Sequence, residues 1–106
     1  MRWCLDRRQR WAPQVEPLTA AAARKLIREI LLTGGVVIGR HARDEMKNDS
    51  LDEQDVLFVL RSGIVDEAEW EQGEWRHRVR AARNVAIVHI ESERRLIVVT
   101  VWKSRR

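Results

Sequence analysis

Basic and bulky side chains alternate in one run of the chain, Trp75-Arg76-His77-Arg78-Val79-Arg80. Successive side chains of a β-strand point to opposite faces, so the run predicts a strand with Arg76, Arg78 and Arg80 on one face of a sheet. Neighbouring guanidinium groups repel one another, and a protein that keeps them together commonly binds an anion with them, of which nucleic acid is the favoured polyanion. The alternative is a solvated strand face whose arginines pair with glutamates across the sheet.

Three residues that follow this run in the sequence could also contact a nucleic acid. Arg83 follows the run at an expected turn. Thr100 interrupts the apolar stretch Leu96–Val101, where its hydroxyl could hold a phosphate oxygen or orient a histidine, although threonine is also a common strand residue. Trp102 could stack on an unpaired base, or it could close the end of the hydrophobic core.

The elements that would position these side chains begin with helices. Thr19 can cap a helix that runs to about Thr33. A short helix is expected over His41–Lys47. Ser50, with Glu53 three residues later, has the capping-box spacing that starts a third helix.

Strands are expected to follow the helices. The four strands predicted after the third helix are about Ile64–Trp70, Glu74–Ala81, Val85–Glu91 and Arg94–Trp102, and a shorter apolar run stands at Val36–Ile38. Their close spacing favours antiparallel pairing. The sequence therefore predicts one α+β domain over residues 18–106, in which N-terminal helices pack on a four-stranded, mainly antiparallel sheet. An irregular arm rich in arginine and tryptophan is expected over residues 1–17.

Composition limits the classes of protein to consider. The chain has 106 residues and a formal net charge of +4, which fits one small domain. The charge is unevenly spread, because residues 41–69 hold nine acidic and three basic side chains, between two basic ends. Cys4 is the single cysteine, which excludes an internal disulfide and a cysteine-based zinc site. No apolar run reaches the length that spans a bilayer or forms a signal peptide, so we expect a cytoplasmic protein without a metal or cofactor.

Several short motifs stand in a familiar order along the chain. They are His41-Ala42-Arg43-Asp44-Glu45-Met46, Leu51-Asp52-Glu53-Gln54-Asp55-Val56, Val59-Leu60-Arg61-Ser62-Gly63-Ile64-Val65 and Val98-Val99-Thr100-Val101-Trp102. Over roughly Val36–Trp102 the chain resembles the family called domain of unknown function 4258. That family has a His-Ala opening, an acidic helix with Asp-Val, a Leu-x-x-Gly close and a terminal strand that carries threonine. The segment Trp75–Arg78 resembles a subset with a Trp-Arg-aromatic-Arg strand.

The resemblance implies a fold and an activity. The family is thought to belong to the barnase–EndoU–colicin–RelE group of small ribonuclease folds, so a RelE/barnase-like fold is implied. In that group a helix packs on a four-stranded sheet, and the open sheet face or its rim cuts RNA. Many members are toxins of toxin–antitoxin pairs, and chains similar to this one are expected beside a small zinc-ribbon antitoxin.

This chain departs from the family pattern at three positions. The family often carries arginines four and eight residues after the motif histidine, where this chain has Glu45 and Asp49. Two phosphate-binding charges are thus reversed, which either abolishes catalysis or moves this work to the basic run and Arg83. A tyrosine frequent in the family is replaced by His77.

Metal-free cleavage of RNA needs a base for the 2′-hydroxyl proton, a cation at the phosphate and an acid for the leaving 5′-oxygen. Histidine suits both proton roles, and the planar guanidinium of arginine can hold two phosphate oxygens. His41 is the first candidate for proton transfer because the family motif begins there, although a histidine at a helix start can simply cap or pack. His77 is expected to be buried against the helices, and His89 to be a core or edge residue.

We therefore expect a metal-independent endoribonuclease toxin that binds RNA and is held silent by a cognate antitoxin. The expected catalytic residues are His41, Arg76, Arg78 and Thr100, and the expected RNA contacts are Arg80, Arg83 and Trp102. Two alternatives stay open. One is a non-catalytic RNA-binding or ribosome-associated module, and the other is an interaction protein whose charged faces serve only protein partners.

Overall fold

The computed structural model describes residues 4–5, 11–12 and 17–104. Most of the predicted arm lies outside these residues, Trp3 and Pro13 included. Within the N-terminal arm, β1 (Cys4–Leu5) and β2 (Trp11–Ala12) form a short antiparallel pair.

Three helices form in the described chain, as the sequence predicts. They are α1 (Ala20–Thr33), α2 (Arg40–Asn48) and α3 (Glu53–Ser62). The Thr19 hydroxyl caps α1 by accepting a hydrogen bond of 3.1 Å from the Ala22 N–H. In the part of the chain that the structure describes, no helix is both long and apolar enough to cross a membrane.

The start of α3 differs from the prediction. Asp52, not Ser50, is the N-cap, and it exchanges two hydrogen bonds of 2.9 Å with Asp55 in a capping box. Ser50 instead has a φ of 57°, so it lies in the left-handed turn that links α2 to α3. Both positions carry a capping residue followed by an acidic one three residues later, and the turn decides between them.

The sheet has six strands rather than the predicted four. They are β3 (Gly35–Ile38), β4 (Ile64–Val65), β5 (Glu69–Glu71), β6 (Glu74–Arg80), β7 (Asn84–Ser92) and β8 (Arg95–Lys103). The order is β3-β8-β7-β6-β4, and β5 pairs with β6. The sheet is mixed, because β3 runs parallel to β8 while the other neighbours in this sheet are antiparallel.

The strand predicted over 64–70 is interrupted by a one-residue change of register. Ile64 lies opposite Arg80, and Glu69 lies opposite Arg76. Five steps along one side therefore match four steps along β6, and the extra residue lies in the segment 66–68 between β4 and β5. Such an irregularity bends a strand and strengthens its twist.

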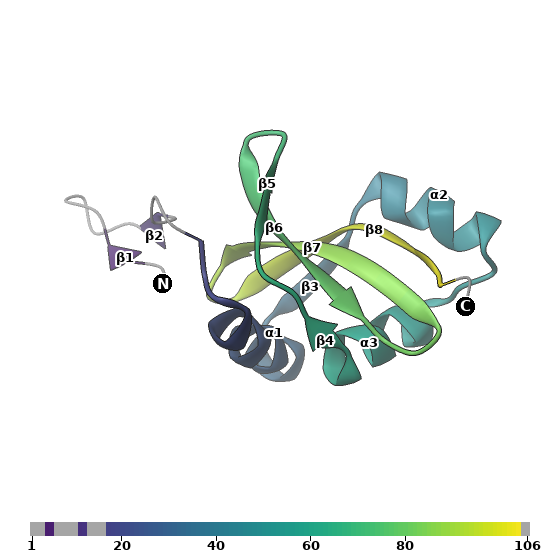
Figure 1. Ribbon diagram of the computed structural model, residues 1–106, viewed down its shortest axis with the longest axis horizontal. Helices are drawn as coiled ribbons and strands as arrows, with labels where there is room; N and C mark the ends of the chain where they lie inside the picture. Colours follow the sequence, from purple (N-terminus) through teal and green to yellow (C-terminus); the bar gives the residue numbers. More distant parts are fainter. Residues whose placement is uncertain (1–3, 6–10, 13–16, 105–106) are drawn as a thin grey trace.

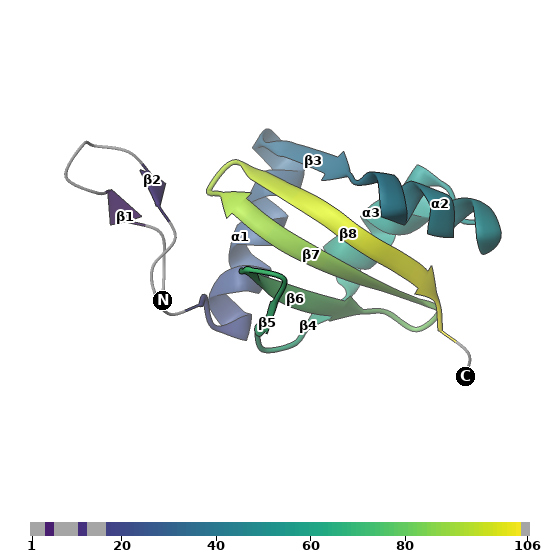
Figure 2. The ribbon, with the colours of Figure 1, turned by 90° about the horizontal axis from the view of Figure 1, so that it is seen from above.

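Helices α1 and α3 cover one face of the sheet, and α2 packs along β8 at the edge (Figures 1 and 2). The core lies between the sheet and these two helices, and its fully buried members include Ile27, Ile30, Val56, Val59, Val79, Val88, Leu96 and Val98. The opposite sheet face is covered by no helix among the described elements (Figure 2). We call it the open face.

Candidate functional site

Strand β6 presents its arginines to the open face. His77 and Val79 are buried on the helix side of the strand. Because side chains alternate along a strand, Arg76, Arg78 and Arg80 share the open face, which is the arrangement that the sequence predicts.

Strand register aligns two of these arginines with residues of β7 and β8. Two rows of side chains cross the open face from β6, and they are Arg78–Ile87–Thr100 and Arg80–Val85–Trp102. Neighbouring strands lie about 4.8 Å apart, so each row spans roughly 10 Å. Each row therefore begins with a guanidinium, passes an aliphatic side chain, and ends at a hydroxyl or an indole.

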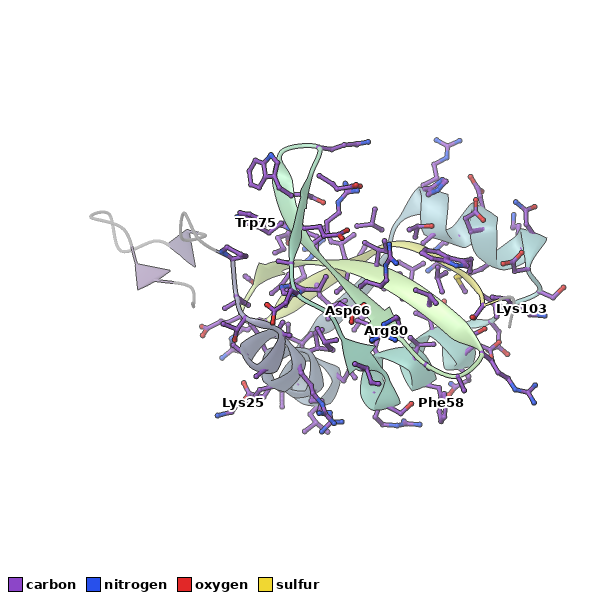
Figure 3. All side chains as sticks on the ribbon, viewed as in Figure 1. Lys25, Phe58, Asp66, Trp75, Arg80 and Lys103 are labelled. Carbon is purple, nitrogen blue, oxygen red and sulfur yellow. The ribbon has the colours of Figure 1, made fainter. Side chains whose placement is uncertain are left out.

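A carboxylate already compensates the charge of Arg80. Asp66 receives hydrogen bonds of 2.8 Å from Arg80 Nε and 2.9 Å from its terminal nitrogen (Figure 3). The hydrogen bond from Arg80 holds the pKa of Asp66 below its usual value, and the charges of Arg80 and Arg78 lower it further. The same contact raises the pKa of Arg80. Arg80 is therefore tied to a fixed anion.

Arg78 and Arg76 differ in how their charges are balanced. Arg78 is exposed, and no ion pair within 4.0 Å joins it to another described residue. Arg76 is only 15% exposed, and its Nε donates a hydrogen bond of 2.9 Å to Glu74. Arg78 therefore offers the least compensated cation of β6 to an incoming phosphate.

Glu74 also joins an imidazole to this face. His89 Nε2 lies 3.6 Å from Glu74 Oε1, while His89 Nδ1 lies 3.0 Å from the carbonyl oxygen of Trp75. A carbonyl oxygen can only accept, so Nδ1 carries a proton and Nε2 faces the carboxylate. We call His89, Glu74 and Arg76 the Glu74 cluster. It places an oriented imidazole, a carboxylate and a guanidinium on the same sheet face as Arg78.

The structure does not bring His41 to the arginines. His41 begins α2, its side chain is 68% exposed, and its Nε2 lies 3.9 Å from Glu45. Strands β7 and β8 lie between α2 and β6. His41 and the basic run therefore belong to different parts of the surface.

His77 lies on the helix side of the sheet. It is 3% exposed, and its Nδ1 lies 3.0 Å from the carbonyl oxygen of Asp66. Burial lowers the pKa of His77, against a smaller opposing effect of that hydrogen bond. A buried neutral imidazole that holds a backbone carbonyl has a structural role.

Asp49, one of the residues that depart from the family pattern, has a structural partner. Asp49 accepts a hydrogen bond of 2.9 Å from the backbone N–H of Lys103, which ties the end of α2 to the end of β8. An arginine could not accept this bond. Arg83 is exposed in the β6–β7 turn, where its carbonyl oxygen accepts from the Ser104 N–H at 2.7 Å.

Sequence reasoning gave Glu74 no role in the chemistry and expected His89 to be structural. For His89, a signal was present in the predicted turn after β6. Arg80 pairs with Val85 across that turn. Four residues further from the turn on each strand, Arg76 of β6 therefore lies opposite His89 of β7. The position of His89 on the open face, rather than on the helix face, decides its accessibility.

The fold and the site define the class of the protein, an α+β domain with a mixed sheet. Helices cover one face of this sheet, and the other face carries cations. Residues 38–103 match the family described as Domain of unknown function (DUF4258). The match covers more than half of the chain, which therefore belongs to this family, as its motifs indicate. Comparison with curated proteins and with solved structures gave no match. Among the described residues, no group of three His, Cys, Asp or Glu side chains could hold a metal ion.

Proposed function

We propose that the protein is a metal-independent endoribonuclease that binds and cleaves RNA on its open face. The observation that carries this proposal is the Glu74 cluster, in which an oriented imidazole and a carboxylate lie on the same sheet face as the exposed guanidinium of Arg78. These groups supply the three requirements of the reaction, which are a base, an acid and a cation at the phosphate.

The roles follow from the chemistry of each group. Arg78 holds the non-bridging phosphate oxygens, and the Thr100 hydroxyl at the far end of its row donates to the same strand of RNA. Glu74 accepts the proton of the 2′-hydroxyl as its oxygen attacks phosphorus. The bond to the 5′-oxygen breaks, and His89, in the form protonated on both ring nitrogens, gives that oxygen its Nε2 proton and is left as the neutral imidazole with the proton on Nδ1. The products are a 2′,3′-cyclic phosphate and a 5′-hydroxyl end.

The biological setting is part of the same proposal. Helices on one sheet face and cations on the other support the likeness to RelE/barnase-type ribonucleases that the sequence motifs imply. We therefore propose a cytoplasmic toxin that a cognate antitoxin of the zinc-ribbon type holds silent. Expression of the chain alone should arrest bacterial growth and fragment RNA, and His89→Ala should relieve both effects.

The decisive measurement is cleavage of an end-labelled RNA by the purified chain in the presence of EDTA. His89→Ala should lower the rate by about 10²- to 10⁴-fold, the usual contribution of a positioned acid or base. Arg78→Ala should lower it as well, because the phosphate loses its cation. Thermal unfolding of each variant separates a loss of chemistry from a loss of fold.

His41→Ala is the matched comparison, since it removes an imidazole from α2 instead of the open face. A cleavage rate that depends on His41 and not on His89 would contradict the placement of the catalytic site on the open face. A wild-type chain that does not cleave RNA would contradict the proposed endoribonuclease activity.

A non-catalytic RNA-binding module is the second candidate. It is favoured by the carboxylates that compensate Arg76 and Arg80, because groups already paired contribute less to a reacting phosphate. This candidate predicts RNA binding that weakens steeply with salt, without any cleavage product.

A further inference from the structure

The β5–β6 hairpin projects away from the body of the domain (Figure 1). We call residues 69–76 the arm; this hairpin is a different segment from the N-terminal arm of residues 1–17. Its tip is a two-residue turn in which Gln72 has a φ of 50° and Gly73 a φ of 82°. Positive φ at both central residues matches the tight turns whose twist suits a hairpin. The arm is therefore a regular β-ribbon up to its tip.

Two contacts between the strands make the arm rigid. Trp70 and Trp75 lie opposite each other, and their rings meet edge to face with centroids 5.1 Å apart and planes at 71° (Figure 3 labels Trp75). Arg76 of β6 lies 3.7 Å from Glu71 of β5 and also binds Glu74. A ribbon fixed in this way loses little conformational entropy when a partner binds it.

The arm carries an exposed aromatic side chain, that of Trp70. Trp70 is 59% exposed although its neighbour Trp75 supports it from one side. Tryptophan is enriched among the residues that dominate the binding energy of protein interfaces. A large exposed ring on a preformed projection is therefore suited to insertion into a pocket.

The charge of the arm identifies the kind of partner. It holds Glu69, Glu71 and Glu74 against the single cation Arg76, and Glu67 precedes it. Glu69 and Glu71 have no part in the proposed cleavage, and their carboxylates repel the phosphates of RNA, which the cationic rows of β6 attract instead. The same carboxylates attract a protein surface that is rich in lysine and arginine.

We propose that the arm is a docking element for a partner protein, and that Trp70 enters an apolar pocket whose rim is basic. This inference does not depend on RNA cleavage, because the two surfaces use different side chains apart from Arg76 and Glu74. RNA or a second copy of the chain on the arm would be a different occupant, and the experiment separates these outcomes.

The test is a selection of random cyclic peptides against the immobilised full chain, followed by measurement of their dissociation constants. The enriched peptides should combine lysine or arginine with apolar residues. Trp70→Ala should weaken their binding at least tenfold, and the double variant Glu69→Gln/Glu71→Gln should weaken it severalfold and reduce its salt dependence. Leu32→Ala is the matched control, since Leu32 is an exposed apolar side chain on α1, and it should leave binding unchanged.

Several results would overturn the inference. These are the failure to enrich any peptide that depends on Trp70, the enrichment of acidic or uncharged peptides, and equal effects of Leu32→Ala and Trp70→Ala. Crosslinking of RNA to Trp70 would assign the arm to nucleic acid. A dimer in light scattering that Trp70→Ala dissociates would assign it to a second copy. Circular dichroism of each variant confirms that the fold is retained.

Discussion

At the scale of single residues, Asp66 organises the arginines of the open face. Its N–H donates a hydrogen bond of 2.8 Å to the carbonyl oxygen of Arg78, and its own carbonyl oxygen meets His77. Its carboxylate takes the two-pronged position on Arg80 that a phosphate could take. Asp66 therefore competes with any anion that approaches Arg80.

Asp66→Asn should consequently strengthen RNA binding severalfold, because it frees the Arg80 guanidinium. The slope of log affinity against log salt should steepen by about 0.7–0.9, the value for one further phosphate contact. Fluorescence anisotropy with a labelled RNA at several salt concentrations measures both quantities. Asp44→Asn makes the same charge change on α2. Equal effects of the two variants would show that the change in net charge, and not the release of Arg80, strengthens RNA binding.

His77 should make the stability of the fold depend on pH. Its pKa is lowered in the folded state, so the unfolded chain binds more protons at mildly acid pH. The contribution of neutral His77 is complete above the unfolded pKa, about 6.5, and is lost as the pH falls below that value. The associated slope cannot exceed about 1.4 kcal/mol per pH unit for one proton.

Urea unfolding of the wild type and of His77→Gln across this range checks the expectation. The variant should be less stable at neutral pH and should lose less stability on acidification. Parallel curves for the two proteins would show that another group causes the pH dependence.

The residues of the open face were predictable to different degrees. Alternation alone places Arg76, Arg78 and Arg80 together, because it depends only on local geometry. The partnership of Glu74 with His89 depends on strand register, and that of Asp66 with Arg80 depends on the register of β4 against β6. Such long-range pairings are not contained in the local pattern.

At the scale of elements, the junction between α3 and β4 is tightly packed. A Cβ atom at Gly63 would lie 2.6 Å from the Val59 carbonyl oxygen, 2.8 Å from Val79 Cγ1 and 3.0 Å from the Arg80 carbonyl oxygen. Gly63 therefore lets the end of the helix approach β6 closely.

Gly63→Ala should destabilise the protein by about 1–3 kcal/mol, the usual cost of overpacking. The midpoint of urea unfolding should fall while its slope stays constant. Gly35→Ala is the control, because a Cβ atom there would have no neighbour within 4 Å. Similar losses in both variants would attribute the effect to glycine substitution in general.

Helix and strand boundaries followed from sequence wherever a local signal was unique. Thr19 caps α1 as predicted. Ser50 and Asp52 offered competing caps for α3, and only the left-handed turn at Ser50 resolves them. The run Val36–Ile38 was predicted as a strand, but local pattern could not show that it pairs in parallel with β8.

At the scale of the whole molecule, the α+β class and the family are confirmed, while the ribonuclease toxin remains a proposal. Two kinds of surface come from residues 69–80 of the chain. The open face carries the β6 arginines, and the arm carries glutamates beside an exposed tryptophan. The open face therefore suits an acidic partner, and the arm suits a basic one.

The guanidinium of Arg76 belongs to both surfaces, since it holds Glu71 of the arm and Glu74 of the imidazole cluster. A ligand that displaces this side chain at one site alters the free energy of binding at the other. Thermodynamic reciprocity then requires that each ligand change the affinity of the other by the same factor. A single salt-bridged arginine thus provides a physical route for communication between two ligands that never touch.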